Sequence, residues 1–312
     1  MWACPDCPAP PLVPNPVSVD SLTYENQPTY QIETPRATYM YHKQGAGLAS
    51  LIDNDAQDWI SFRDIPGSKT AGEYRGIPNL VFAEGSSANS FFHPGFTNGT
   101  SQLVSAGPLK VTVRSQAGPP SNFWDVLWEF YPEYARMTVL EAGPSDNGPY
   151  WFLYEGTIGG SMDAGDVVVR SDGTQTSAFD YGAVWEDTLE PPSWVYFRDT
   201  AASRALYLSE DLGDTSPDSY RPQGQTSGST PEMTVFGFGR DGMRKFLDSV
   251  PQSFSIGFIE STDHAVIGRA VSKRNTVSQL ASVVESDRAQ ARGGQGLAAL
   301  EQFALTHPGD RK

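Results

Sequence analysis

Cysteine is almost absent from this chain. The sequence contains only two, Cys4 and Cys7, which form a CxxC pair inside a proline-rich segment. A redox site built on this motif needs a strand before it and a helix after it, and a zinc site needs a second pair of ligands. The sequence offers neither. We therefore interpret Cys4 and Cys7 as a local disulfide or as two thiols without a catalytic role.

Long apolar runs and an excess of positive charge are also missing. No stretch approaches the ~18 uninterrupted apolar residues that a membrane-spanning helix needs. Lysine and arginine total 22 against 37 aspartates and glutamates, which gives a formal net charge of −15. Such a surface repels phosphate backbones and anionic lipid headgroups, so we expect neither nucleic acid nor a membrane as partner. The same field opposes a polyanionic glycan unless arginines and lysines gather in a cleft.

Several families of sites are excluded because their motifs are missing. The chain has no GxSxG sequence, no phosphate-binding loop and no dinucleotide fingerprint, which argues against serine hydrolases and nucleotide enzymes. The acidic stretch SEDLGDTSPDSY, residues 209–220, lacks the ligand spacing of a calcium loop. We therefore expect no metal and no cofactor.

Aromatic residues and turn formers are plentiful. Aromatics make up 12% of the chain, and there are 24 prolines and 30 glycines. From Thr29 to Glu260, short aromatic or β-branched runs alternate with clusters of Gly, Pro, Asn, Asp and Ser, which predicts many short strands joined by turns. The predicted strands are TYQIET, ATYMYHK, PLKVTVRSQ, FWDVLWEFY, ARMTVLEA, YWFLYEG, DVVVRS, SWVYFRD, ALYLSED, MTVFGFGR and QSFSIGFIE.

The run FWDVLWEFYPEYARMTVLEA, residues 123–142, shows the strand pattern most clearly. Trp124, Val126, Trp128 and Phe130 occupy one phase of a period of two, and more polar residues occupy the other. YPEY then supplies a turn and ARMTVLEA returns, which predicts an antiparallel pair. No strand–helix–strand rhythm calls for a parallel sheet. We therefore predict an all-β fold, a large antiparallel β-sandwich.

The pattern changes near the C-terminus. Residues 275–307 place apolar residues at helical spacing, with Ser278 or Asn275 as a possible cap and a Gly-Gly break, which predicts two helices that pack on the sheet edge or mediate association. The predicted organisation is a disordered proline-rich segment over 1–28, a β domain over 29–268 and a helical extension over 269–312.

Two of the four histidines lie in aromatic surroundings. His42 ends the run TYMYHK just before a glycine-containing turn, and His93 lies in SFFHPGF. A histidine at a strand end presents an imidazole that titrates near neutral pH, which suits acid or base catalysis. The alternative is that both imidazoles only hydrogen-bond to turn carbonyls.

Further polar and aromatic residues are candidates for binding a substrate. Glu73, Tyr74 and Arg75 share one turn, where a guanidinium and a phenol can orient hydroxyls or hold a carboxylate. A weak surface pair between Glu73 and Arg75 is the alternative. A second group surrounds the predicted hairpin and the strand after it, where exposed aromatic faces would stack on sugar rings and buried ones would belong to the core. It consists of Tyr131, Tyr134, Arg136, Trp151, Tyr154 and Glu155.

The stretch HKQGAGLASLIDNDAQDWISF, residues 42–62, resembles the first hairpin of the galactose mutarotase-like supersandwich proteins. The resemblance would cover about residues 29–260. It implies a β-supersandwich and a carbohydrate ligand, because the superfamily includes aldose epimerases, domains of polysaccharide lyases and hydrolases, and sugar-binding proteins. The residues that carry it are Gly45, Gly47, Ser50, Leu51, Asp53, Asp55 and Trp59.

With this resemblance, the leading hypothesis is a polysaccharide lyase that cleaves a uronic-acid-containing glycan by β-elimination. His42 or His93 would act as base or charge neutraliser, Tyr134 as proton donor and Arg75 as carboxylate clamp. The alternatives are a glycoside hydrolase with Glu73 and Glu155 as its paired carboxylates, a non-catalytic sugar-binding protein, and an aldose epimerase.

A secreted or periplasmic location is expected from this function. The opening residues MWACPDCPAPPLVPNP lack the charged and apolar regions of a signal peptide, so no leader supports that expectation. The sequence indicates no oligomeric state.

Overall fold

The computed structural model describes the greater part of the chain, and every structural statement below concerns that part. The described residues are 17–61, 78–83, 91–92, 99–118, 123–143, 150–156, 158–160, 164–177, 185–187, 189–211, 217–223, 233–239 and 251–289.

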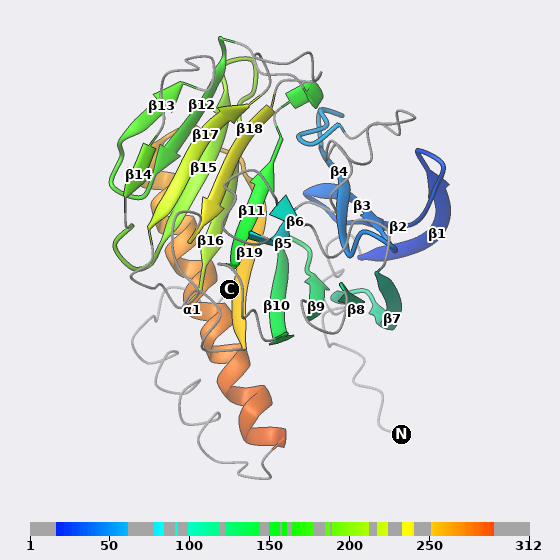
Figure 1. The fold of residues 1–312 in the computed structure, drawn as a ribbon. Coiled ribbons are helices and arrows are strands. Elements are labelled where there is room, and N and C mark those ends of the chain that lie inside the picture. Colours follow the sequence, from blue (N-terminus) through cyan, green and yellow to red (C-terminus); the bar gives the residue numbers. More distant parts are fainter. Residues whose placement is uncertain are drawn as a thin grey trace, which may run out of the picture.

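Three antiparallel sheets and one long helix form the described structure (Figure 1). The four-stranded N-terminal sheet has the order β1 (Ser18–Tyr24), β2 (Gln27–Glu33), β3 (Ala37–His42), β4 (Gly47–Asp53). The nine-stranded large sheet has the order β13 (Gln175–Ser177), β12 (Asp166–Arg170), β15 (Trp194–Asp199), β16 (Ala205–Glu210), β19 (Gln252–Ile259), β10 (Ala135–Ala142), β9 (Trp124–Phe130), β8 (Lys110–Ala117), β7 (Thr100–Gly107). The six-stranded facing sheet has the order β14 (Trp185–Asp187), β17 (Asp218–Gln223), β18 (Met233–Phe238), β11 (Tyr150–Glu155), β5 (Asn79–Ala83), β6 (Phe91–Phe92). A 3-10 helix spans Ile158–Gly160, and α1 spans His264–Ala289.

The predicted strands and the all-β class are confirmed. β9 and β10 pair antiparallel as expected, and the turn closes with a hydrogen bond of 2.8 Å from the Tyr131 amide to the Tyr134 carbonyl. The predicted disordered segment over 1–28 is wrong in its second half, because β1 lies there and pairs along its whole length with β2. The prolines on either side of this segment hid the strand in the sequence.

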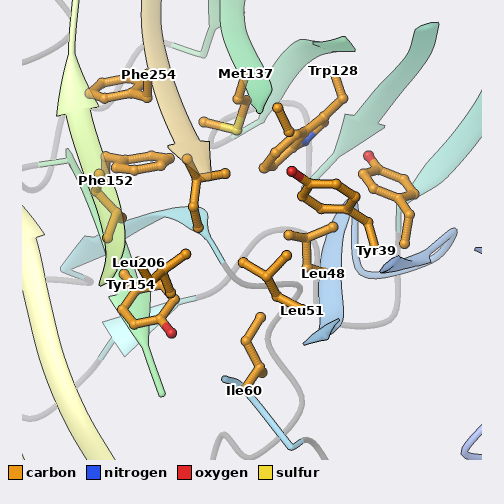
Figure 2. Close-up of a cluster of buried hydrophobic side chains, with 14 of the residues drawn as sticks. Tyr39, Leu48, Leu51, Ile60, Trp128, Met137, Phe152, Tyr154, Leu206 and Phe254 are labelled. Atoms are coloured by element: carbon orange, nitrogen blue, oxygen red, sulfur yellow. The ribbon is translucent and has the colours of Figure 1, made fainter. Parts of the chain in front are cut away.

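The two faces of the large sheet differ because its strands alternate apolar and polar residues. Trp124, Val126, Trp128 and Phe130 of β9 are at most 1% exposed and point into the main core, as the period of two predicts. The core lies between the large sheet on one side and the other two sheets on the other. Figure 2 shows Tyr39, Leu48 and Leu51 of the N-terminal sheet, Phe152 and Tyr154 of the facing sheet, and Trp128, Met137, Leu206 and Phe254 of the large sheet meeting in it.

Aromatic contacts join the sheets. The rings of Phe152 and Phe254 stack with centroids 4.1 Å apart, which links the facing sheet to the large sheet. Tyr39 meets Phe130 edge-to-face at 5.1 Å and links the N-terminal sheet to the same core. Each such pair adds about 0.5–1.5 kcal/mol beyond the burial of its area.

An ion-pair cluster fixes the N-terminal sheet from outside the core. Asp53 accepts hydrogen bonds from the amides of Asp55 and Gln57 and from the indole nitrogen of Trp59. Arg204, in the turn before β16, lies 3.5 Å from Asp53 and 2.6 Å from Asp55. The aspartates that carry the sequence resemblance therefore shape a turn and bind it to the large sheet.

The predicted C-terminal helix is present, but it begins earlier than expected. Asp263 caps it, because its carboxylate accepts a 2.9 Å hydrogen bond from the amide of Val266. The predicted cap Asn275 lies inside the helix, as does Ser278, and the predicted domain boundary at 268 falls within its first turns. The predicted second helix lies outside the described residues.

The helix packs on a face of the large sheet and not on its edge. Ile267 and Val271 are fully buried against Trp194, Tyr196 and Tyr207, and Figure 1 shows α1 lying along β16 and β19. In the described part of the chain, no helix combines the length and apolar character needed to cross a membrane.

Candidate functional site

A row of polar side chains crosses the face of the large sheet that points away from the main core. The pairing register aligns Ser209 of β16, Ser255 of β19, Arg136 of β10, Glu129 of β9 and Thr112 of β8. We call the face that carries these residues the polar face. Helix α1 covers its β15–β16 side, where the Ser209 hydroxyl donates a 3.0 Å hydrogen bond to Asn275.

Arg136 lies at the centre of the polar face. Its Nε is 3.3 Å from a carboxylate oxygen of Asp211, and its Nη1 is 3.9 Å from Glu129. Its Nη2 also donates a 2.9 Å hydrogen bond to the Ser253 hydroxyl. The side chains of Glu129, Arg136 and Asp211 are 4–8% exposed. Charges this buried persist only when they are paired, so these three groups depend on one another.

Lys110 extends the ion network toward solvent. Its ammonium group pairs with Oε1 of Glu129, whereas Arg136 pairs with Oε2. The Lys110 side chain is 32% exposed. Lys110 also lies over the ring of Tyr131, with its Nζ 5.7 Å from the ring centroid. Glu129 thus links a buried guanidinium to a partly exposed ammonium group.

Two stacked tyrosines form the open end of this network. Tyr131 and Tyr134 come from the two ends of the β9–β10 turn, and their ring centroids are 5.0 Å apart. The Tyr131 side chain lies next to the Glu129 carboxylate. Both side chains are half-buried.

The pKa of each of these phenols is raised above the usual 10.0. Burial is the main cause for Tyr131, and the charge of Glu129 adds to it. Burial is also the main cause for Tyr134, where Tyr207, Asp211 and Glu129 add to the increase and Arg136 opposes it. Both phenols therefore keep their protons at neutral pH and can donate hydrogen bonds.

Gly257 makes room for the tyrosine turn. It lies on β19 opposite Tyr207, and a Cβ atom there would come within 3.0 Å of the Tyr134 Cβ and 3.1 Å of the Glu133 carbonyl. Such contacts are tighter than side chains tolerate without a shift of the neighbouring atoms. Only glycine lets the turn pack this close to β19.

Helix α1 borders the tyrosines through Arg274. Its guanidinium lies 5.1 Å from the ring centroid of Tyr207 and 3.4 Å from the Glu133 carboxylate. Cation–π contact of this kind holds Tyr207 beside the polar face. The site is therefore framed by a helix on one side and a turn at one end.

The structure brings together three of the residues proposed from the sequence, Tyr131, Tyr134 and Arg136. It does not place His42 with them. His42 ends β3 in the N-terminal sheet and is 1% exposed, so the expectation that it borders a binding surface is wrong. The strand end was predicted correctly, but the burial of that end follows from how the sheets pack.

The other proposed residues cannot be placed in the site. Tyr154 of β11 is fully buried in the main core, so it does not belong to the site. Trp151 and Glu155 lie in the same strand, with side chains outside the described part of the structure. Arg75, Glu73, Tyr74, His93, Cys4 and Cys7 also lie outside the described residues.

Glu129, Asp211, Lys110 and Gly257 were not proposed from the sequence. The period of two does put Glu129 on the phase opposite the core tryptophans, which was the available signal. Its meeting with Arg136 and Asp211 depends on the pairing of β9, β10, β19 and β16. That order includes partners more than 100 residues apart in the chain, such as Arg136 and Ser253.

Comparison with known proteins identifies the fold. No family model matches the chain, and no curated protein matches its sequence. The structure resembles that of the protein HI1317, with a TM-score of 0.53 and 14% identity over 80% of this chain and 98% of that one. It also resembles a "putative mutarotase (YeaD)" from Salmonella typhimurium, with a TM-score of 0.54 and 10% identity over 78% of this chain and 96% of the other.

A weaker likeness links the chain to a larger enzyme. Heparan sulfate lyase HepC from Pedobacter heparinus aligns with a TM-score of 0.40 and 9% identity, over 84% of this chain and 38% of the lyase. The fold assignment therefore depends on the two full-length matches. This chain has the galactose mutarotase-like β-sandwich fold that its sequence resemblance implied.

Proposed function

We propose that the polar face binds a saccharide and interconverts its anomers by acid–base chemistry, as an aldose mutarotase does. The observation that carries the proposal is the meeting of a proton-donating phenol, Tyr134, with the carboxylates Glu129 and Asp211 around Arg136. The similarity in fold to the Salmonella protein, whose name reads "putative mutarotase", supports the same class of reaction.

The balance of charge favours a neutral substrate. The positive charges of Lys110 and Arg136 are matched by the negative charges of Glu129 and Asp211. A uronate would add a further negative charge to a chain that already carries −15. Among the described residues of the site, no excess of positive charge offsets it, so we infer a neutral sugar.

Mutarotation needs one group that accepts a proton and one that donates one. The acceptor removes the proton of the anomeric hydroxyl while the donor protonates the ring oxygen. The bond between the anomeric carbon and the ring oxygen then breaks, and the carbonyl rotates. The ring closes on its other face as the hydroxyl that replaced the ring oxygen returns its proton to the donor and the acceptor returns its proton to the carbonyl oxygen. Tyr134 is the proton donor in this proposal, and Glu129 or Asp211 is the acceptor.

The remaining groups position the sugar. Lys110 and the Tyr131 hydroxyl lie at the exposed rim, where they can hydrogen-bond to ring hydroxyls. Arg136 holds both carboxylates in place through its ion pairs.

The test is the rate at which freshly dissolved α-D-glucose and α-D-galactose reach anomeric equilibrium, followed by polarimetry. The protein should accelerate this rate over buffer, and Tyr134→Phe should reduce the acceleration about 100-fold or more, because the ring stays but the proton is lost. Tyr30→Phe, on the N-terminal sheet, is the matched control and should keep full activity. A wild-type rate equal to that of buffer for all neutral aldoses tested would refute the proposal.

A second candidate is β-elimination on a uronate-containing glycan, the leading hypothesis from the sequence. The observation in its favour is that Tyr134 lies beside Arg136, since a phenol and a guanidinium serve this reaction as proton donor and carboxylate neutraliser. Incubation with pectate, alginate and heparan sulfate would decide it. A rise in ultraviolet absorbance from unsaturated ends would favour the lyase over the mutarotase.

A further inference from the structure

A polar cavity lies at the edge of the large sheet. Its volume is about 400 Å³, and it is lined by Thr100, Ser101 and Gln102 of β7 together with Arg114 and Gln116 of β8. All five side chains are polar. A cavity of this size with several hydrogen-bond donors and acceptors is suited to a hydroxyl-rich ligand.

The cavity continues the polar face that carries the candidate site. Lys110, Thr112, Arg114 and Gln116 alternate along β8, so all four project from the same face. Thr112 pairs with Glu129, and Arg114 lies one step further along, opposite Leu127. Arg114 is four residues from Lys110, or about 13 Å at about 3.3 Å per residue. That separation exceeds the length of one sugar ring.

The charge inside the cavity is compensated. Arg114 donates from Nε and Nη2 to the two oxygens of Asp125, at 2.9 and 2.6 Å. Gln116 donates a third hydrogen bond of 2.8 Å to the same carboxylate. Asp125 is 3% exposed, whereas the Arg114 side chain is 52% exposed. Two of the five N–H groups of the guanidinium are used in this fork, which leaves others able to donate to a ligand.

Two exposed side chains complete the lining from the edge strand. Gln102 pairs with Arg114 and Thr100 pairs with Gln116 in the sheet register, and both side chains are exposed. An amide and a hydroxyl can each donate and accept, which matches the hydroxyls of a sugar. With Arg114 already neutralised by Asp125, the cavity gives an anion no advantage over a neutral group.

We propose that this cavity is a second saccharide subsite, which holds a neutral sugar unit of an oligosaccharide whose reducing end occupies the candidate site. The inference rests on the proposed function, because it assumes that a saccharide lies on the polar face. It adds the substrate class: a chain of at least two neutral units, and not only a free monosaccharide.

The experiment compares affinities across chain length by isothermal titration calorimetry. The probes are glucose, maltose, cellobiose and the matching tri- and tetrasaccharides, together with oligogalacturonates. The wild-type protein should bind a neutral oligosaccharide about 10-fold more tightly than glucose, which corresponds to a few additional hydrogen bonds. Oligogalacturonates should show no such increase.

The variant Thr100→Ala/Gln102→Ala removes two exposed groups of the cavity and leaves the Arg114–Asp125 fork intact. It should lose most of the 10-fold increase and bind glucose as the wild type does. Val104→Ala changes an exposed residue of the same strand outside the cavity lining and should bind every probe normally.

The outcomes separate the two proposals. Glucose binding that does not strengthen with chain length, or a gain that the double variant retains, refutes the subsite and leaves the proposed function standing. A larger gain with oligogalacturonates refutes the neutral class. No binding of any saccharide by the wild type refutes both proposals together.

Discussion

At the scale of single residues, Arg136 is the group on which the candidate site depends. It is buried between Glu129 and Asp211, so its removal leaves two carboxylates without their shared counter-charge. We expect Arg136→Ala to lower the free energy of unfolding by about 3–5 kcal/mol, measured by urea denaturation. Arg36→Ala, which removes a guanidinium from an exposed pair with Glu260, is the control and should lower it far less. Equal losses of stability in the two variants would show that the buried ion-pair network stabilises the fold no more than an exposed arginine does.

Gly257 controls the position of the tyrosine turn. In Gly257→Ala, the added methyl group meets the Cβ and backbone of Tyr134 at 3.0–3.1 Å, so the turn must shift away from β19. We expect a loss of about 1–3 kcal/mol in stability, as overpacking usually causes, and a reduced rate of mutarotation. Gly107→Ala is a matched control, because its new Cβ has 3.9 Å to the nearest atom. An unchanged rate in Gly257→Ala would mean that Tyr134 is not held by this contact.

The sequence alone predicted the part of the candidate site that surrounds the β9–β10 turn. The clustering of Tyr131, Tyr134 and Arg136 was visible because the three lie within six positions of the chain around one turn. His42 was misplaced because its neighbours in sequence, Tyr39 and Tyr41, say only that the strand is aromatic. Whether the end of that strand is open or covered depends on other sheets.

At the scale of elements, helix α1 begins at an aspartate that the sequence prediction missed. Asp263 caps the helix through the amide of Val266, and its replacement by alanine leaves that donor without this partner. We expect Asp263→Ala to lower the free energy of unfolding by about 1 kcal/mol, measured by chemical denaturation. Asp263→Ser keeps a capping oxygen and should retain most of the stability. A loss of the same size in the serine variant would point to a cause other than capping.

The β9–β10 hairpin was predicted because all its information is local. Alternation fixes the face of each residue and YPEY fixes the turn, so the register follows from about 20 adjacent residues. The neighbours of the hairpin could not be predicted in this way. β10 pairs with β19, which lies more than 100 residues later in the chain, and composition does not indicate which distant strand is the partner.

At the scale of the whole molecule, buried phenols make the fold sensitive to alkaline pH. Burial is the main cause that raises the pKa of Tyr39, Tyr41 and Tyr154 above the usual 10.0. The folded state thus favours the protonated phenols more than the unfolded state does. Their contribution to stability is fully present below pH ~10 and is lost as the pH rises above that value.

The measurement is the urea midpoint between pH 8 and 11, recorded together with tyrosinate absorbance. We expect the urea concentration at the midpoint to decrease once the pH exceeds ~10, and tyrosinate to form together with unfolding. Gradual ionisation of all tyrosines without any loss of structure would contradict the burial of these side chains.

The sequence by itself determined that this protein is built from antiparallel strands, where its main hairpin turns, and which face of that hairpin is apolar. These properties follow from alternation and turn chemistry among neighbouring residues. Only the tertiary structure decided that Glu129, Arg136 and Asp211 meet, and that His42 is enclosed. Both outcomes depend on which distant strands pair and which sheets cover them, because burial and ion pairing are properties of surfaces that the chain forms only after it has folded.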